Sequence, residues 1–210
     1  MVTLGRLGIE CKTVTELSED MFSDFALSEF RKAGVEPVNV YHGSKIAVNI
    51  TAAAITRNDR AFVSYGNEEN SADANEIYNS LKGAKAVAMH ADMPEVYERL
   101  KKDGTTVILD TGYIEGMSLE KYEHLLEIAD YFLPNRKEAE ILSGTTDPKK
   151  AAKIFSKYVN TAIVKLDKEG CLIYKDSSYI FVDSILYKVI SDISQGTAFA
   201  ENVNIQKVCV

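Results

Sequence analysis

Short apolar segments alternate with amphipathic helical segments from residue 71 onward, and this alternation limits the possible folds more than any other feature. The apolar segments are AVAMH (86–90), TVILD (106–110), YFLPN (131–135) and TAIVKL (161–166). The helical segments include 72–81, PEVYERLKK (94–102), LEKYEHLLEIA (119–129) and DPKKAAKIFSKY (147–158). Nearly unbroken apolar strands between amphipathic helices are typical of a mainly parallel sheet with helices on its faces. The sequence therefore predicts an α/β fold, followed by a hairpin over CLIYK and YIFV (171–182).

The first third of the chain has a different pattern. Residues 19–33 carry apolar side chains at helical spacing and Gly34 follows as a stop signal, which predicts a helix there. Residues 38–66 are rich in β-branched and aromatic residues, with a turn-forming TRND at 56–59. We expect an antiparallel β patch at 38–66, inserted in a single domain that spans 1–210.

Composition argues against several classes of function. The 210 residues are 46% hydrophobic and 26% charged, which suits a soluble globular chain, and the net charge of -7 disfavours nucleic acid or an anionic membrane as the main partner. Cys11, Cys171 and Cys209 lack metal-ligand spacing and fit a reducing compartment. With no secretory signal pattern and no apolar run of about 20 residues, the expected location is the cytoplasm.

Three strand ends carry residues that are suited to chemistry, since ligands of open α/β sheets bind beyond the carboxyl ends of the strands. Asp110 ends one strand, and it fits either a polar crevice or an ordinary exit into a loop. Asn135 and Glu138 have the spacing of a capping box, and an amide with a carboxylate at a strand end can equally hold a hydrated Mg²⁺ and phosphates. Lys165 fits either a solvated hairpin end or a contact with a nucleotide phosphate.

Common catalytic and metal-binding signatures are missing from the sequence. There is no Walker A, GxSxG or HExxH motif, and His42, His90 and His124 do not have zinc-ligand spacing.

Taken together, the segments resemble the ribokinase-like PfkB carbohydrate kinases. The opening GRLGIECKTVTELSEDMFSDFALSEFRKAGVEPVNV is similar to the family's "RLG…vG.D.fG…GV" stretch, LPNRKEAEILSG to "pN..Ea..l.G", and AIVKLDKEGCLIY to its strand-turn-strand "vvvtlG..G". The matches occur in family order and cover nearly the whole chain, and the PN..E stretch is the most specific of them.

The resemblance implies a three-layer ribokinase-like fold in which residues 38–66 form a small antiparallel β lid. It also implies ATP- and Mg²⁺-dependent phosphorylation of a sugar or related small alcohol, with a possible homodimer through the lid. By position, Asn135 and Glu138 match the residues that organise Mg²⁺. Residues Lys165, Asp167, Gly170 and Gly196 match nucleotide contacts, and Asn49 in the lid matches a substrate contact.

The chain departs from the family pattern at three places. Asp167 replaces a glycine, which puts close backbone approach of the nucleotide in question. The family's initial GGN-type segment has no counterpart before residue 1. In place of the family's D-T-x-G-A-G-D, whose last Asp is the general base, the chain has DISQGTAF (192–199), so that either Thr197 stands at the base position or the signature is deleted. Either alignment removes the catalytic Asp.

Two hypotheses follow from the sequence. The first is an active ATP-dependent carbohydrate kinase. The second is a catalytically impaired chain that binds a nucleotide or sugar, or that dimerises through the lid, because loss of a general base reduces turnover by about 10²–10⁴-fold.

Overall fold

The computed structural model describes residues 1–55, 60–66, 72–112 and 115–184. The chain divides into two compact units, Met1–Leu81 and Lys82–Val210. The single domain expected over 1–210 stays a prediction. None of the helices in the described ranges is long and apolar enough to cross a membrane.

The first unit contains a parallel strand pair with helices. Its described elements outside the lid segment are α1 (Val2–Arg6), β1 (Cys11–Thr15), α2 (Met21–Lys32), β2 (Val35–Asn39) and α3 (Ala74–Leu81). Helix α2 begins where the carboxylate of Asp20 accepts hydrogen bonds from the backbone N–H groups of Phe22 and Ser23, which are otherwise unpaired donors of the first turn. The prediction of a helix at 19–33 is therefore confirmed.

Strand β2 corrects part of the prediction for residues 38–66. It pairs with β1 in parallel, with Val14 opposite Val38 and Thr15 opposite Asn39, so the start of that region does not belong to an antiparallel patch. The sequence argument missed β1 because a five-residue strand with a Lys and two Thr lacks a clear apolar pattern.

The antiparallel part of the region is the hairpin of β3 (Ile50–Ile55) and β4 (Arg60–Tyr65), which form a two-stranded sheet. Thr51 pairs with Ser64 and Ala53 with Phe62, while Ala52 pairs with Val63 on the opposite face. Because side chains alternate between faces along a strand, Ile50, Ala52, Ala54, Ala61, Val63 and Tyr65 share one face. That face is entirely nonpolar or aromatic.

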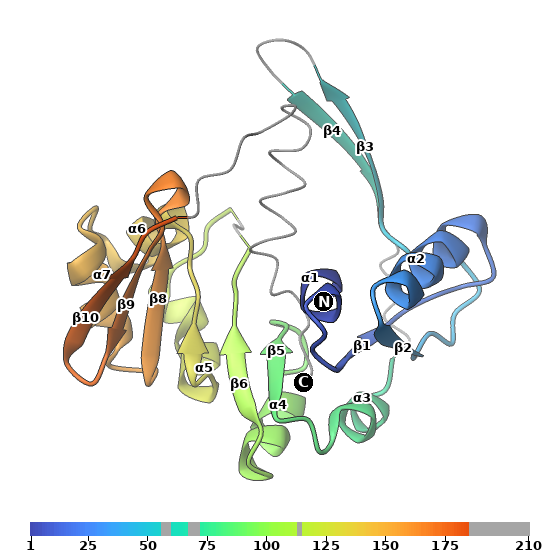
Figure 1. Ribbon diagram of the computed structural model, residues 1–210, viewed down its shortest axis with the longest axis horizontal. Coiled ribbons are helices and arrows are strands. Elements are labelled where there is room, and N and C mark those ends of the chain that lie inside the picture. The colour runs from blue at the N-terminus through green and yellow to red at the C-terminus, as the bar shows by residue number, and fades with distance from the viewer. Residues whose placement is uncertain (56–59, 67–71, 113–114, 185–210) are drawn as a thin grey trace. The chain divides into compact units, whose positions relative to one another are not determined.

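The second unit is built on a six-stranded sheet in the order β10-β9-β8-β7-β6-β5 (Figure 1). The strands are β5 (Ala86–Met89), β6 (Thr106–Leu109), β7 (Tyr131–Phe132), β8 (Thr161–Lys165), β9 (Cys171–Lys175) and β10 (Ser178–Val182). Strands β5 to β8 pair in parallel, and β8, β9 and β10 pair antiparallel. This arrangement confirms the α/β prediction, including the final hairpin.

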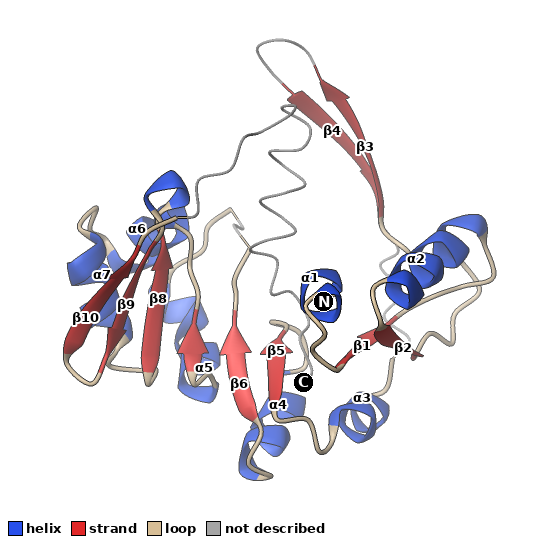
Figure 2. Cartoon of the chain, viewed as in Figure 1, coloured by secondary structure: helices blue, strands red, loops and turns tan. Residues whose placement is uncertain are grey.

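Four helices pack against the strands of this sheet (Figure 2). They are α4 (Pro94–Lys102), α5 (Leu119–Ile128), α6 (Arg136–Ser143) and α7 (Pro148–Phe155). The rings of Phe132 on β7 and Phe155 on α7 meet edge to face with 5.0 Å between centroids, and neither residue is exposed. Such burial of apolar surface between sheet and helices is the main stabilising contribution.

Strand order fixes which loops meet. Strands β6, β7 and β8 are adjacent and parallel, so their carboxyl ends lie at one edge of the sheet. The residues that follow these ends are Asp110, Asn135 and the neighbours of Lys165. The sheet therefore gathers the three candidate segments that are far apart in the sequence.

Candidate functional site

Three segments form one polar corner at the carboxyl ends of β6, β7 and β8. Lys165, the last residue of β8, donates its backbone N–H to the carbonyl oxygen of Pro134 at 2.9 Å. A parallel bridge also pairs Lys165 with Asn135, so the pairing of β7 and β8 continues to the first turn of α6. The backbone thus holds the start of α6 beside the end of β8. We call Asp110, Thr111, Asn135, Glu138 and Lys165 the corner.

Asn135 and Glu138 form the predicted capping box. The side-chain oxygen of Asn135 accepts from the backbone N–H of Glu138 at 2.9 Å, and Glu138 Oε2 accepts from the backbone N–H of Asn135 at 2.9 Å. Asn135 Nδ2 also donates to Glu138 Oε1 at 2.6 Å. The two side chains therefore have a well-defined geometry, because each accepts a hydrogen bond from a backbone N–H group at the start of α6 and they also bond to each other.

The carboxylate of Glu138 is buried in this corner. Only 2% of the residue is exposed, and Thr111 Oγ1 donates a long hydrogen bond of 3.4 Å to Oε2. Burial raises the pKa of Glu138, because it penalises the charged form more than the backbone hydrogen bond from Asn135 and the nearby charge of Lys165 favour it. The negative charge of Asp110 raises this pKa further. A bound cation would therefore be favourable here.

Asp110 and Lys165 form an ion pair across the corner. Lys165 Nζ lies 2.7 Å from Asp110 Oδ1, and their side chains are only 17% and 9% exposed, respectively. Burial raises the pKa of Asp110, and the positive charge of Lys165 opposes that effect. The structure thus gives Asp110 a defined role in the corner, and it gives Lys165 a carboxylate partner rather than a fully solvated position.

The turn after β8 lies next to the corner. It comprises the short 3₁₀ segment Asp167–Glu169 and Gly170, and Leu166 N–H donates to the Gly170 carbonyl at 2.8 Å. Asp167 has φ 53, a left-handed conformation that glycine adopts without strain. The replacement of the family glycine by Asp167 therefore preserves a glycine-like backbone path while adding a carboxylate.

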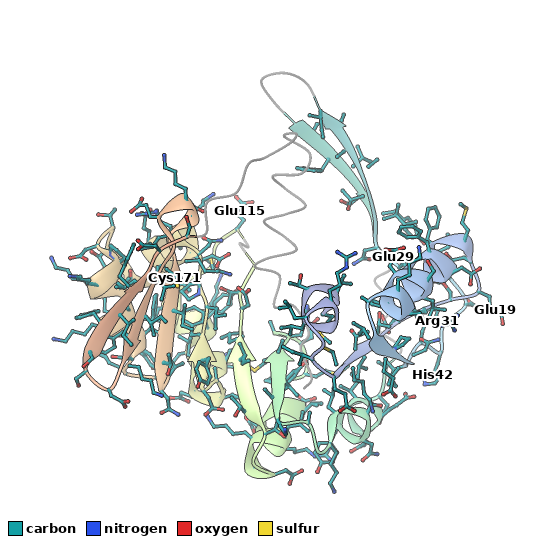
Figure 3. The ribbon with its side chains drawn as sticks, viewed as in Figure 1. Glu19, Glu29, Arg31, His42, Glu115 and Cys171 are labelled. Carbon is teal, nitrogen blue, oxygen red and sulfur yellow. The ribbon has the colours of Figure 1, made fainter. Side chains whose placement is uncertain are left out.

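Position 170 requires a glycine for steric reasons. Its φ is 105, and a Cβ added there would overlap the Val182 carbonyl oxygen and lie 2.8 Å from the backbone nitrogen of Ser184. A glycine is therefore required where the turn passes under the end of β10. Cys171, the register partner of Lys165 across this turn, is labelled in Figure 3.

The oxygen donors of the corner are of the chemical type that Mg²⁺ binds. Among the described residues there is no group of three or more His, Cys, Asp or Glu side chains that could hold a metal ion. Mg²⁺ does not need one, because it retains several waters and is often bound by one or two carboxylates together with phosphates. A carboxylate offers about four acceptor sites, and Glu138 uses three of them here. The donor set therefore fits one inner or water-mediated Mg²⁺ contact.

Three further predicted site residues are not among the corner residues described above. Asn49 is exposed, directly precedes β3 and belongs to the first unit, so the corner does not include it. Gly196 and Thr197 lie outside the described residues. By contrast, Asn135, Glu138 and Lys165 come together in the structure.

Two residues of this region were missed by the sequence analysis. Thr111 directly follows the apolar strand that ends at Asp110, and its position alone was a usable signal. Arg136 offered no signal, because its partners Asp167 and Glu169 lie on the turn after β8, which only the strand order brings near.

Comparison with known proteins identifies the family. The model for pfkB family carbohydrate kinases matches residues 1–194. The chain belongs to the PfkB family of carbohydrate kinases. This finding confirms the family resemblance that the sequence motifs indicated.

Individual relatives agree with this assignment. The chain is 24% identical over 206 residues to an uncharacterized sugar kinase from Archaeoglobus fulgidus, a match that covers 93% of this chain and 82% of that protein. It is also 24% identical over 233 residues to a 5-dehydro-2-deoxygluconokinase from Clostridium perfringens, covering 95% of this chain and 67% of that one.

Solved structures show the same fold. A ribokinase from Thermotoga maritima has a TM-score of 0.72 at 22% identity, covering 97% of this chain and 70% of that chain. A putative ribokinase II from E. coli, in complex with ATP and Mg²⁺, has a TM-score of 0.69 at 19% identity, covering 95% and 70%. The PfkB chain therefore has a ribokinase-like α/β fold.

Proposed function

We propose that this PfkB protein transfers the γ-phosphoryl group of ATP to a hydroxyl group of a sugar or related small alcohol, with Mg²⁺ as cofactor. The family assignment and the sugar kinase relatives support this class of reaction. The observation that carries the proposal is the polar corner, where a buried carboxylate and an ion pair meet at the carboxyl ends of β6, β7 and β8. That edge is where α/β sheets bind their ligands.

Within this proposal, Asn135 and Glu138 hold the metal side of the site. Their capping box gives the Glu138 carboxylate one orientation, so that it can receive a hydrated cation without losing its bond to the helix start. Mg²⁺ bound there would neutralise charge on the ATP phosphates during transfer.

Lys165 and the turn 167–170 are the residues that contact the nucleotide in this proposal. The Lys165 ammonium group is held at the strand end by Asp110, which places a positive charge beside the metal side of the site. Asp167 and Gly170 lie in the turn that follows β8. Gly196, outside the described residues, and Asn49, as a sugar contact, complete the proposed set.

A second candidate function is binding of a nucleotide or sugar without turnover. The observation that favours it is the sequence DISQGTAF at 192–199, in which either Thr197 stands at the position of the family's general base or the family signature is deleted. A threonine hydroxyl is a poor base at neutral pH.

The lid also has a proposed role, as a homodimer contact. On the apolar face of the hairpin of β3 and β4, Val63 and Tyr65 are 75% and 46% exposed, respectively. A two-stranded hairpin is marginal by itself, so an apolar face of this kind gains from a partner surface. A second copy of the chain offers the same face.

We place the protein in the cytoplasm, where ATP and Mg²⁺ are supplied.

Release of ADP tests the proposed transfer. The purified chain is incubated with ATP and Mg²⁺ and a panel of sugars and sugar acids, and ADP is measured by a coupled assay. Sugar-dependent ADP release, which Glu138→Gln reduces by about 10²-fold or more and Glu140→Gln leaves unchanged, supports an active kinase. Glu140 lies on the same helix outside the capping box. No release with any sugar, combined with normal ATP binding, supports the second candidate, and the Thr197→Asp variant then tests whether a base alone was missing.

A further inference from the structure

Arg136 connects the start of α6, which belongs to the corner, with the turn after β8, which lies next to it. It is the first residue of α6, next to Asn135, and its Nη2 lies 2.7 Å from Glu169 Oε1 while its Nε lies 3.9 Å from Asp167 Oδ2. Both acidic residues belong to the turn after β8. One side chain therefore connects the start of α6 to the turn that is proposed to face the nucleotide.

We propose that Arg136 is a positioning residue for ATP: through its ion pairs with Asp167 and Glu169 it offsets the two carboxylates that the turn 167–170 carries. The inference rests on the proposed function, because it concerns the binding of MgATP at the corner. Arg136 need not touch the nucleotide itself, since it acts through Asp167 and Glu169.

Two hydrogen bonds to main-chain atoms already anchor this turn and the residue before it. Lys165 N–H donates to the Pro134 carbonyl at 2.9 Å, and the Ser184 hydroxyl donates to the Lys168 carbonyl at 2.6 Å. The side chains of Asp167 and Glu169, at 65% and 59% exposure, are not fixed by these bonds. Arg136 is 34% exposed and is the basic partner that the structure shows for both of them. Its planar guanidinium group has several donors and can face two carboxylates at once.

The charge of the turn affects the binding of ATP, because the phosphates of ATP are negatively charged. Without Arg136, Asp167 and Glu169 would present two carboxylates that only Lys168 accompanies within the turn. Like charges near an anionic ligand weaken its binding, and salt screens the effect over a distance of about 10 Å at 0.1 M.

Isothermal titration of MgATP into the full-length protein tests the inference at about 0.05 M and about 0.5 M KCl. We expect Arg136→Gln to raise the Kd about three- to tenfold at low salt, the effect of one lost charge in a partly screened site, and less than about twofold at high salt. Adding Asp167→Asn and Glu169→Gln to that variant is expected to restore the low-salt Kd. Lys153→Gln, which removes one exposed positive charge from α7, is the control and is expected to leave the Kd unchanged.

The possible outcomes separate the two proposals. An unchanged Kd in Arg136→Gln, with normal binding by the parent chain, overturns the role of Arg136 and leaves the proposed function standing. A weaker Kd that neither salt nor removal of the two carboxylates corrects also overturns it, because a general loss of packing does not respond to charge. If the parent chain does not bind MgATP, the proposed nucleotide site fails and this inference fails with it.

Discussion

Glu138 is the residue on which the site depends most. It is a fully buried carboxylate whose two oxygens accept hydrogen bonds from Asn135 and Thr111, and it sits at a helix N-terminus, where partial positive charge favours an anion. Burial nevertheless outweighs these effects and raises the pKa of Glu138 above its ordinary value of 4.5. A group in this state gains from a nearby cation, which is consistent with a metal-binding role.

The raised pKa of Glu138 predicts how stability depends on pH. Because the folded state holds this proton more tightly than the unfolded state, the unfolding free energy gains a contribution from Glu138 as pH falls from neutral toward about 4.5. The gain is about 1.4 kcal/mol for each unit by which folding raises the pKa. Urea unfolding of the parent chain and of Glu138→Gln should show a difference that moves in favour of the parent as pH falls. A difference independent of pH would contradict the raised pKa.

The ion pair of Asp110 and Lys165 gives a second prediction at this scale. Lys165→Met leaves the Asp110 carboxylate buried without its partner, so we expect the unfolding free energy at pH 7 to fall by about 3 kcal/mol. The double variant Asp110→Asn with Lys165→Met removes both charges and should lose less than the single variant. Equal losses in the single and double variants, measured by urea unfolding, would show that the two side chains are not coupled.

At the scale of elements, the turn 167–170 depends on a glycine for reasons of space. Gly170→Ala places a Cβ against the Val182 carbonyl in a left-handed backbone conformation, so it combines a steric overlap with strain. Gly104→Ala is a matched control, because Gly104 also has a positive φ of 94 but nothing lies within 4 Å of its added Cβ. We expect Gly104→Ala to lower the unfolding free energy by about 1 kcal/mol and Gly170→Ala by about 3 kcal/mol or more. Equal losses of unfolding free energy in the two variants would contradict the close approach of the end of β10 to Gly170.

The hairpin of β3 and β4 provides another test at this scale. Val63 is 75% exposed on the apolar face of the hairpin, while Thr51 lies on the other face, where its hydroxyl contacts that of Ser64 at 2.9 Å. If the apolar face joins two copies, Val63→Asp should weaken the dimer by about tenfold or more, and Thr51→Asp should change it much less. Sedimentation equilibrium measures both. A parent chain that is monomeric at high concentration would overturn the lid contact.

Elements with strong patterns were predictable from the sequence, and side-chain partners were not. Helix α4 occupies the predicted residues 94–102 because its apolar spacing, initial proline and basic last turn agree. The pairing of β1 with β2 was not predicted, since parallel partners separated by a helix leave no local signal. The capping box was readable because it spans three positions, whereas Asp110 and Lys165 are 55 positions apart and meet only through the order of β6, β7 and β8.

At the scale of the whole molecule, family and site support the same reaction class. The match to PfkB carbohydrate kinases covers residues 1–194, and the corner places a buried carboxylate, an amide and an ammonium group where such a fold binds ligands. The sequence DISQGTAF at 192–199, on which the second proposed candidate rests, lies outside the described residues. Binding of MgATP is shared by the proposed kinase and by the second candidate where that candidate binds a nucleotide.

If the corner binds ATP together with Mg²⁺, the affinity of the chain for ATP depends on Mg²⁺ and on Glu138. Calorimetric titration of ATP into the full-length chain should show binding at micromolar to millimolar concentrations with Mg²⁺ present. Binding should weaken by about tenfold or more with EDTA or in Glu138→Gln. Glu140→Gln should bind as the parent does. Absence of binding at millimolar MgATP, or binding that is indifferent to both Mg²⁺ and Glu138, would contradict the account.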